Sequence, residues 1–140
     1  MEITIEWQKP LQLTQNKKPL ATPDNIPAEI SPYPGVYFFA RWFGDSSVPF
    51  YVGQSLNIRS RLKSHLESAK IYKALLGLKI ENIELGIGPR FFHYGYLKVK
   101  PGQQAKTCVK IVERQMIREA AVERGFQVLN SQGSLLENIK

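Results

Sequence analysis

Two apolar runs flank a short polar stretch in the first half of the chain. Residues 35–43 and 48–53 are rich in aromatic and β-branched side chains, and the polar residues 44–47 lie between them. Apolar runs on either side of turn-forming residues predict a β-hairpin. A regular hairpin centred on position 44 would place Tyr37 and Tyr51 opposite each other, close enough to act on one ligand.

The pattern then changes to the period of a helix. Asn57 is a natural N-cap for a helix expected over residues 58–76. Leu62, Leu66 and Ala69 form an apolar stripe along this helix.

The second half of the chain predicts one more strand and one more long helix. Residues 91–99 have the composition of a strand and follow a glycine-rich loop. Thr107 is expected to cap a helix that runs to Arg124, where Gly125 is a suitable terminating residue. A short extended piece at residues 127–130 completes the compact part, and a loose tail follows.

The N-terminal part of the chain is dominated by proline. Six of the nine prolines fall in the first 34 residues. Proline lacks a backbone donor and fixes φ, which excludes a long helix or a central strand in this stretch. Apart from a short candidate strand at residues 3–7, we expect residues 1–33 to form an arm that lies over the domain.

Composition is ordinary for a globular protein and indicates one domain. The chain has 140 residues, 43% of them hydrophobic, and no apolar stretch approaches the roughly 20 residues that span a bilayer. No secretory signal is recognised at the N-terminus. Cys108 is the single cysteine, which excludes an internal disulfide and fits a reducing compartment. We therefore expect a cytoplasmic protein with no membrane partner.

The charge is strongly positive and unevenly distributed. The net charge is +7, and residues 54–124 hold 14 of the 19 lysines and arginines but 6 of the 12 acidic residues. Such a field attracts polyanions. A basic solvated surface is the alternative for the charge excess alone, but the motifs described next favour a nucleic acid as the partner.

Tyr37 and Tyr51 are the first candidates for chemistry. Tyrosines in strands are most often packing residues with a satisfied hydroxyl group. Gly35 and Gly53, however, leave room beside them for a backbone or a phosphate to approach. A phenol titrates near pH 10, so its use as a base at neutral pH requires a nearby cation.

Four basic residues follow on the first helix. Arg61 and His65 are four residues apart and project from the same face. Arginine matches phosphate oxygens and can neutralise charge in a transition state, although a solvated helix charge is its usual role. Arg59 and Lys63 are expected to contact the phosphate backbone or simply to lie at the surface.

Glu113 falls within the apolar stripe of the last helix, between Val109 and Ile117. A carboxylate facing a core is unfavourable unless it pairs with a cation or binds a metal. The alternatives are therefore a salt bridge to a buried arginine and a Mg²⁺-type site completed by water and substrate oxygens. A four-spaced basic stripe beside it is suited to a phosphate backbone: Lys110, Arg114 and Arg118.

Several other site types are excluded by the sequence. It has no cluster of acidic residues for a two-metal nuclease and no Cys/His zinc pattern. It also lacks a phosphate-binding P-loop and a dinucleotide fingerprint. A nuclease built from this chain would use one metal ion at most.

Over residues 34–130 the chain resembles the GIY-YIG endonuclease family. The resemblance rests on six positions in the right order: Tyr37, Tyr51, Arg61, His65, Glu113 and Asn130. The tripeptides Gly35-Val36-Tyr37 and Tyr51-Val52-Gly53 are weak signals individually, and the ordered set is specific. The 13 residues between the two tyrosines form a slightly longer gap than usual in the family. The arm has no counterpart.

The resemblance implies an α/β fold of the α+β type, with a small three-stranded antiparallel sheet flanked by helices. It also implies a DNA endonuclease that uses one Mg²⁺ or Mn²⁺ ion. Tyr37 would take a proton from the attacking water, Tyr51 would position that water, and Arg61 would steady the scissile phosphate. Glu113 would hold the metal, His65 would orient groups or relay a proton, and Asn130 would support the site.

Two alternatives to a nuclease remain. The first is a non-catalytic nucleic-acid-binding module with the same fold, which would typically have lost Arg61 or Glu113. The second is an RNA-binding protein that stacks bases on the aromatic residues of the strand at 91–99. These aromatic residues alternate along the strand, so packing in the core explains them better.

Overall fold

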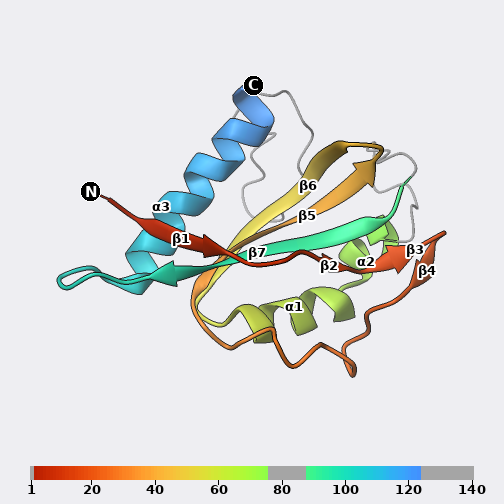
Figure 1. Cartoon of the computed structure of the whole chain (residues 1–140), viewed down its shortest axis with the longest axis horizontal. Coiled ribbons are helices and arrows are strands. Elements are labelled where there is room, and N and C mark those ends of the chain that lie inside the picture. The colour runs from red at the N-terminus through yellow and green to blue at the C-terminus, as the bar shows by residue number, and fades with distance from the viewer. Residues whose placement is uncertain (1, 76–87, 124–140) are drawn as a thin grey trace.

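A computed structural model describes residues 2–75 and 88–123, without the side chains of residues 69, 70 and 121–123. Figure 1 shows a mixed α+β arrangement, in which helices lie on both sides of an antiparallel sheet. This agrees with the expected fold class. Asn130, Gly125, the extended piece at 127–130 and the tail at 131–140 lie outside the described residues.

The main sheet has five strands, not the three that were expected. β5 (Gly35–Phe43) pairs with β6 (Ser46–Ser55) on one side and with β7 (Arg90–Lys98) on the other. The two additional strands come from the arm, because β1 (Thr4–Trp7) and β2 (Leu11–Gln12) both pair antiparallel with β7. The first part of the arm therefore extends the sheet, while residues 26–33 lie over α1 as the expected arm over the domain, and β6 is one edge of the sheet.

The β5–β6 hairpin turns tightly, but its register differs from the regular one. Phe43 pairs with Ser46, and an irregularity after Phe39 leaves one extra residue in β6. As a result Tyr37 faces Gly53, and Tyr51 faces Phe39. The expectation that the two tyrosines lie directly opposite each other is wrong, because the turn is centred between residues 44 and 45 and the β-bulge adds a further residue, which together move them to diagonal positions.

The first helical segment is two helices. α1 (Ile58–Glu67) begins after Asn57, whose side chain accepts a hydrogen bond from the Ser60 backbone amide, which confirms the predicted N-cap. Ser68 has an extended backbone and separates α1 from α2 (Ala69–Leu75). The single helix expected over residues 58–76 is therefore interrupted.

The last helix begins before the residue expected to cap it. α3 (Ala105–Ile117) has Gln104 as its N-cap residue, with no side-chain capping bond, so Thr107 lies inside the helix. A π-helical turn, η1 (Arg118–Glu123), continues it. In the arm, β3 (Thr14–Gln15) and β4 (Lys18–Pro19) form a separate two-stranded ribbon.

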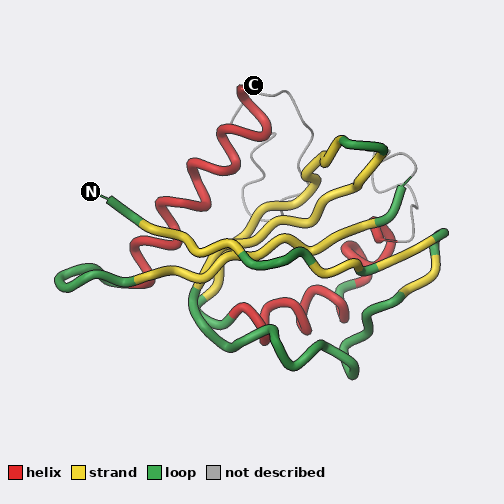
Figure 2. The backbone as a smooth tube through the Cα atoms, viewed as in Figure 1, coloured by secondary structure: helices red, strands yellow, loops and turns green. Residues whose placement is uncertain are grey.

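The two faces of the sheet are covered by different elements. Alternate residues of β5 point to opposite faces, so Tyr37 and Phe39 join one core cluster and Val36 joins another. The first cluster includes α1, α2 and arm residues, and the second includes α3. Figure 2 shows α1 and α3 on opposite sides of the strands. Among the helices of the described residues, none is long and apolar enough to cross a membrane.

Candidate active site

The candidate site is built around Tyr37, which projects from β5 toward α1. Its side chain is almost fully buried, with 2% of its surface exposed. Gly53 makes this position available, because a Cβ atom there would collide with the Tyr37 hydroxyl group. Gly35 has a similar role beside β7, where a Cβ atom would collide with the Gly95 carbonyl group. Of the two expected neighbours, a backbone or a phosphate, Gly35 has the backbone, whereas Gly53 makes room for a side chain.

A short hydrogen bond joins Tyr37 to His65 of α1. The phenol oxygen lies 2.6 Å from Nε2 of His65. Burial raises the pKa of Tyr37 above its usual range, Tyr51 and Glu113 add to the rise, and Arg61 opposes it. Burial also lowers the pKa of His65 to about 4, and the positive charge of Arg61 adds to that shift. Both groups are therefore neutral near pH 7, and with the imidazole proton on Nδ1 the phenol donates to Nε2.

Tyr51 completes an aromatic cluster with this pair. Its ring is nearly parallel to that of Tyr37, with centroids 6.4 Å apart, and meets the His65 ring edge-on at 4.9 Å. Phe39 contacts the same imidazole edge-on at 5.3 Å. The diagonal register thus keeps both tyrosines next to one histidine, although they do not face each other across the strands. Tyr51 is half-buried and lies on the edge strand, nearer to solvent than Tyr37.

Arg61 and Glu113 act on the same cluster from two helices. Arg61 is exposed on α1, and its charge influences the pKa of Tyr37, of His65 and of Glu113. Glu113 is half-buried on α3. Burial raises the pKa of its carboxyl group, while Arg114, Arg61 and Lys110 oppose the rise. Tyr51, His65, Arg61 and Glu113 therefore each interact with Tyr37, through a ring contact, a hydrogen bond or charge, and Asn130 is outside the described part.

Glu113 makes no ion pair with another described residue. Neither of the two ion pairs found among the described residues involves it, so the salt bridge to a buried arginine is not seen there. The described residues contain no group of three or more potential metal ligands. One carboxylate with the remaining positions left to water and phosphate oxygens is a common arrangement for Mg²⁺.

The expected nucleic-acid contacts differ in their surroundings. Lys63 on α1 is exposed, as are the three basic residues of the last helix, Lys110, Arg114 and Arg118. Arg59 is different, because its guanidinium group donates to the carbonyl oxygens of Ile26, Pro27 and Ile30 in the arm. Three of its five N–H donors are therefore used inside the protein, which differs from the expectation that Arg59 contacts phosphate or lies at the surface.

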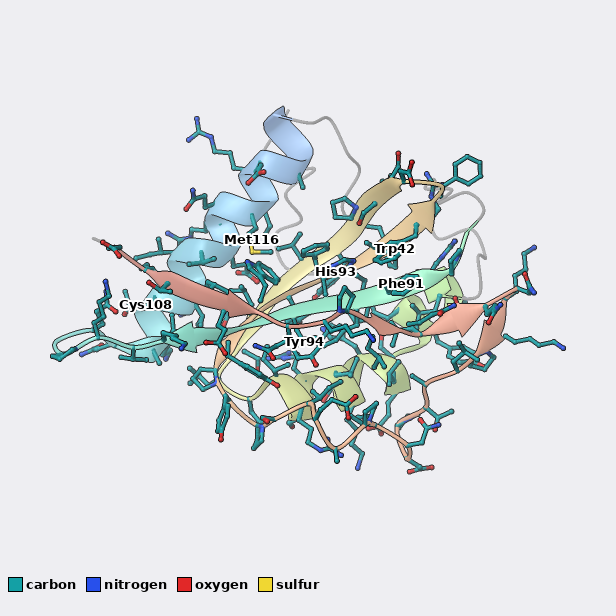
Figure 3. All side chains as sticks on the ribbon, viewed as in Figure 1. Trp42, Phe91, His93, Tyr94, Cys108 and Met116 are labelled. Carbon is teal, nitrogen blue, oxygen red and sulfur yellow. The ribbon has the colours of Figure 1, made fainter. Side chains whose placement is uncertain are left out.

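A second aromatic group on the opposite face of the sheet was not anticipated. Figure 3 shows Trp42, Phe91 and His93 close together on adjacent strands. The Trp42 indole donates to Nε2 of His93 at 2.9 Å, and Phe38 stacks on the same imidazole at 4.4 Å. Burial lowers the pKa of His93 to about 4. The alternation of Phe91 and His93 along the strand was the signal that they share a face.

Comparisons of the chain with family models, with curated proteins and with solved structures give no significant match.

Proposed function

We propose that the chain is a DNA endonuclease of the GIY-YIG type that depends on one Mg²⁺ or Mn²⁺ ion. The observation that carries the proposal is the 2.6 Å hydrogen bond between Tyr37 and a neutral His65, with Arg61 and Glu113 acting on the same phenol. Clusters of buried groups with shifted pKa values are typical of catalytic sites. The order of the motif residues along the sequence supports the same function.

The hydrogen-bonded pair supplies a route for the proton of the attacking water. A phenol whose pKa is raised does not exist as phenolate near pH 7, so Tyr37 accepts a proton only if it gives up its own. Nε2 of His65 is placed to receive it. Arg61 disfavours the resulting imidazolium in the free protein, and a phosphate bound at Arg61 would weaken that repulsion. Substrate binding thus favours the proton transfer that cleavage needs.

Arg61 and Glu113 have complementary tasks. The exposed guanidinium of Arg61 can bind two oxygens of the scissile phosphate and offset the charge that builds up on them in the transition state. The carboxylate of Glu113 would hold the metal ion, whose chemistry when bound is to polarise the phosphate and stabilise the leaving oxygen. Tyr51, at the rim of the cluster, would orient the attacking water with its hydroxyl group.

DNA is proposed as the substrate because basic side chains are exposed on both helices that carry site residues. Lys63 follows Arg61 on α1, and Lys110 and Arg114 flank Glu113 on α3. Neutralising phosphates with such residues releases counterions and supplies affinity that does not depend on base sequence.

Cleavage of supercoiled plasmid in Mg²⁺, with a chelator as the control, tests the function. We expect cleavage that the chelator abolishes, and a fall of at least 10²-fold in Glu113→Gln. Glu119→Gln is the matched control, because Glu119 is an exposed carboxylate of the adjoining η1. Binding of DNA without cleavage in any divalent metal would instead support the non-catalytic module. Equal cleavage by Glu113→Gln and the control would remove Glu113 from the site.

A further inference from the structure

Arg59 connects the arm to the helix that carries Arg61 and His65. One guanidinium nitrogen donates to the carbonyl oxygens of Pro27 (2.7 Å) and Ile30 (3.0 Å), and the other donates to that of Ile26 (3.1 Å). Hydrogen bonds from a charged donor are stronger than neutral ones. A half-buried arginine that donates to three carbonyls is a fixed structural connection and not a solvated charge.

Other contacts attach the same arm segment to the site. The Ile58 amide at the start of α1 donates to the Tyr33 carbonyl at 3.0 Å, and the Ser31 amide donates to the Tyr96 hydroxyl at 2.7 Å. Ile30 is 1% exposed and belongs to the core cluster that contains Tyr37 and Leu62. Figure 2 shows this loop running along α1 on the side away from the sheet. The helix is therefore held between the sheet and the arm.

We propose that the arm is a positioning element of the active site and that Arg59 is the positioning residue through which it acts. α1 is ten residues long and ends at the extended Ser68, so α2 does not continue it as a rigid rod. Its orientation depends on what holds its two sides. The sheet holds one side by apolar packing and by the Tyr37–His65 hydrogen bond, and Arg59 fixes the other with three directional bonds. This fixes the position of His65 against Tyr37 and of Arg61 beside them.

The consequence of losing Arg59 is measurable at His65 without any cleavage assay. A shift of α1 would lengthen the Tyr37–His65 bond and admit water to the imidazole, and the pKa of His65 would rise from about 4 toward its ordinary value of 6.5. Among the described residues, the titratable and charged groups around this imidazole are Tyr37, Tyr51 and Arg61. His93 lies on the opposite face of the sheet and serves as an internal reference in the same NMR spectrum.

The deciding comparison is between Arg59→Lys and Arg59→Gln in the full chain. Lysine keeps the charge, but one ammonium group cannot replace two nitrogens that share three carbonyls. We expect both variants to raise the pKa of His65 by about 1 unit or more and to leave His93 unchanged. Lys63→Gln is the control, because it removes an exposed charge from the same helix. It should weaken DNA binding and leave both histidines unchanged.

The cleavage readout follows from the proposed function and is separable from it. Both Arg59 variants should lower kcat about tenfold or more with little change in KM for DNA. If Arg59 bound phosphate, Arg59→Lys would behave like the wild type and Arg59→Gln would raise KM. An unchanged His65 titration in both variants would overturn the positioning role, whether or not the protein cleaves DNA. A shifted titration in a protein that cleaves nothing would overturn the proposed function and leave the positioning role intact.

Pro27→Gly covers the case in which the Arg59 variants do not fold. This change leaves every side chain of α1 in place and loosens the arm segment that accepts the bonds, because glycine has more conformational freedom than proline. We expect the His65 titration to shift in the same direction by a smaller amount. If the Pro27→Gly variant has the His65 pKa of the wild type, the arm does not position α1.

Discussion

The Tyr37–His65 bond shows how burial changes what two ordinary side chains can do. In water, tyrosine and histidine exchange protons with solvent independently of each other. In this protein burial disfavours both charged forms, the phenolate of Tyr37 and the imidazolium of His65. Among the described residues, the acceptor hydrogen-bonded to the Tyr37 hydroxyl group is Nε2 of His65. The chemistry therefore belongs to the pair and not to either residue alone.

Replacing Tyr37 with phenylalanine should separate chemistry from packing. The substitution removes one hydroxyl group and keeps the ring, so the lost hydrogen bond should lower the free energy of unfolding by about 0.5–1.5 kcal/mol. The cleavage rate should fall by about 10²–10⁴-fold if Tyr37 takes part in proton transfer. Plasmid cleavage and urea unfolding, measured on the same preparation, test both expectations. A variant that cleaves normally would leave Tyr37 with a packing role and point to Tyr51 or His65 as the base.

Stability should fall as the pH drops from 7 toward 4. The pKa of His65 is about 4 in the folded protein and 6.5 in the unfolded chain, so in this range the unfolded state binds more protons. The stability due to neutral His65 is fully present above pH 6.5 and is lost as the pH falls toward 4. At pH 5 the loss is on the order of 2 kcal/mol.

Urea unfolding at pH 7.5 and pH 5 measures this dependence. The pKa of His93 is lowered in the same direction. His65→Gln and His93→Gln should therefore each remove part of the pH dependence of stability. If stability is equal at the two pH values in the wild type, the imidazoles are not buried in their neutral form.

At the scale of elements, the sequence predicted well the helices and strands that are marked by local composition. The hairpin, the strand at 91–99 and the Asn57 cap were all expected, because apolar runs, turn residues and capping residues are local signals. The hairpin register was missed because the bulge is set by how Phe39 and the residues around Pro49 pack, and no dipeptide marks it. Ser68 was not recognised as a break, because serine is compatible with a helix interior.

Tyr37, Arg61, His65 and Glu113 were proposed as site residues by type and order, and in the structure Arg61, His65 and Glu113 each interact with the Tyr37 phenol. The partners of Arg59 could not be predicted, because they are backbone carbonyl groups. The side chains of the residues that carry these carbonyl groups give no signal for the contact. Of the two arm strands that pair with β7, β1 matches the candidate strand expected at residues 3–7, whereas β2, which directly follows Pro10, was not expected.

The basic residues of the last helix should determine the salt dependence of DNA binding. Arg114 and Arg118 are exposed, and each phosphate contact adds about 0.9 to the slope of log affinity against log salt. The double variant Arg114→Gln/Arg118→Gln should therefore reduce that slope by about 2, as measured by fluorescence anisotropy with a labelled duplex.

The matched control is Lys98→Gln/Lys100→Gln, which removes the same charge. These two lysines pair with Glu6 and Glu2 at the other edge of the sheet, so the slope should change little. An equal fall of the slope in both double variants would mean that DNA binding depends on the net charge of the protein and not on the basic residues of α3 and η1.

At the scale of the whole molecule, β7 is the strand that joins the strands of the arm to the β5–β6 hairpin in one sheet. It pairs with β5 on one side and with β1 and β2 of the arm on the other, and its partners reach back to Thr4, which faces Lys98. The hairpin of β5 and β6 is local in sequence, whereas these pairings are distant. Contacts between distant segments slow folding, because the intervening chain must first be ordered.

The central position of β7 has a consequence for biosynthesis. The arm and the hairpin leave the ribosome before β7 does. Until β7 is synthesised, the edge of β5 that pairs with β7 is unpaired, and aromatic residues such as Phe39 are uncovered. Such edges readily pair with other chains. The protein should therefore be most prone to aggregation during translation. Slower elongation before residue 90 should lower the yield of soluble protein, and this loss should exceed the loss of soluble protein when the folded form is heated.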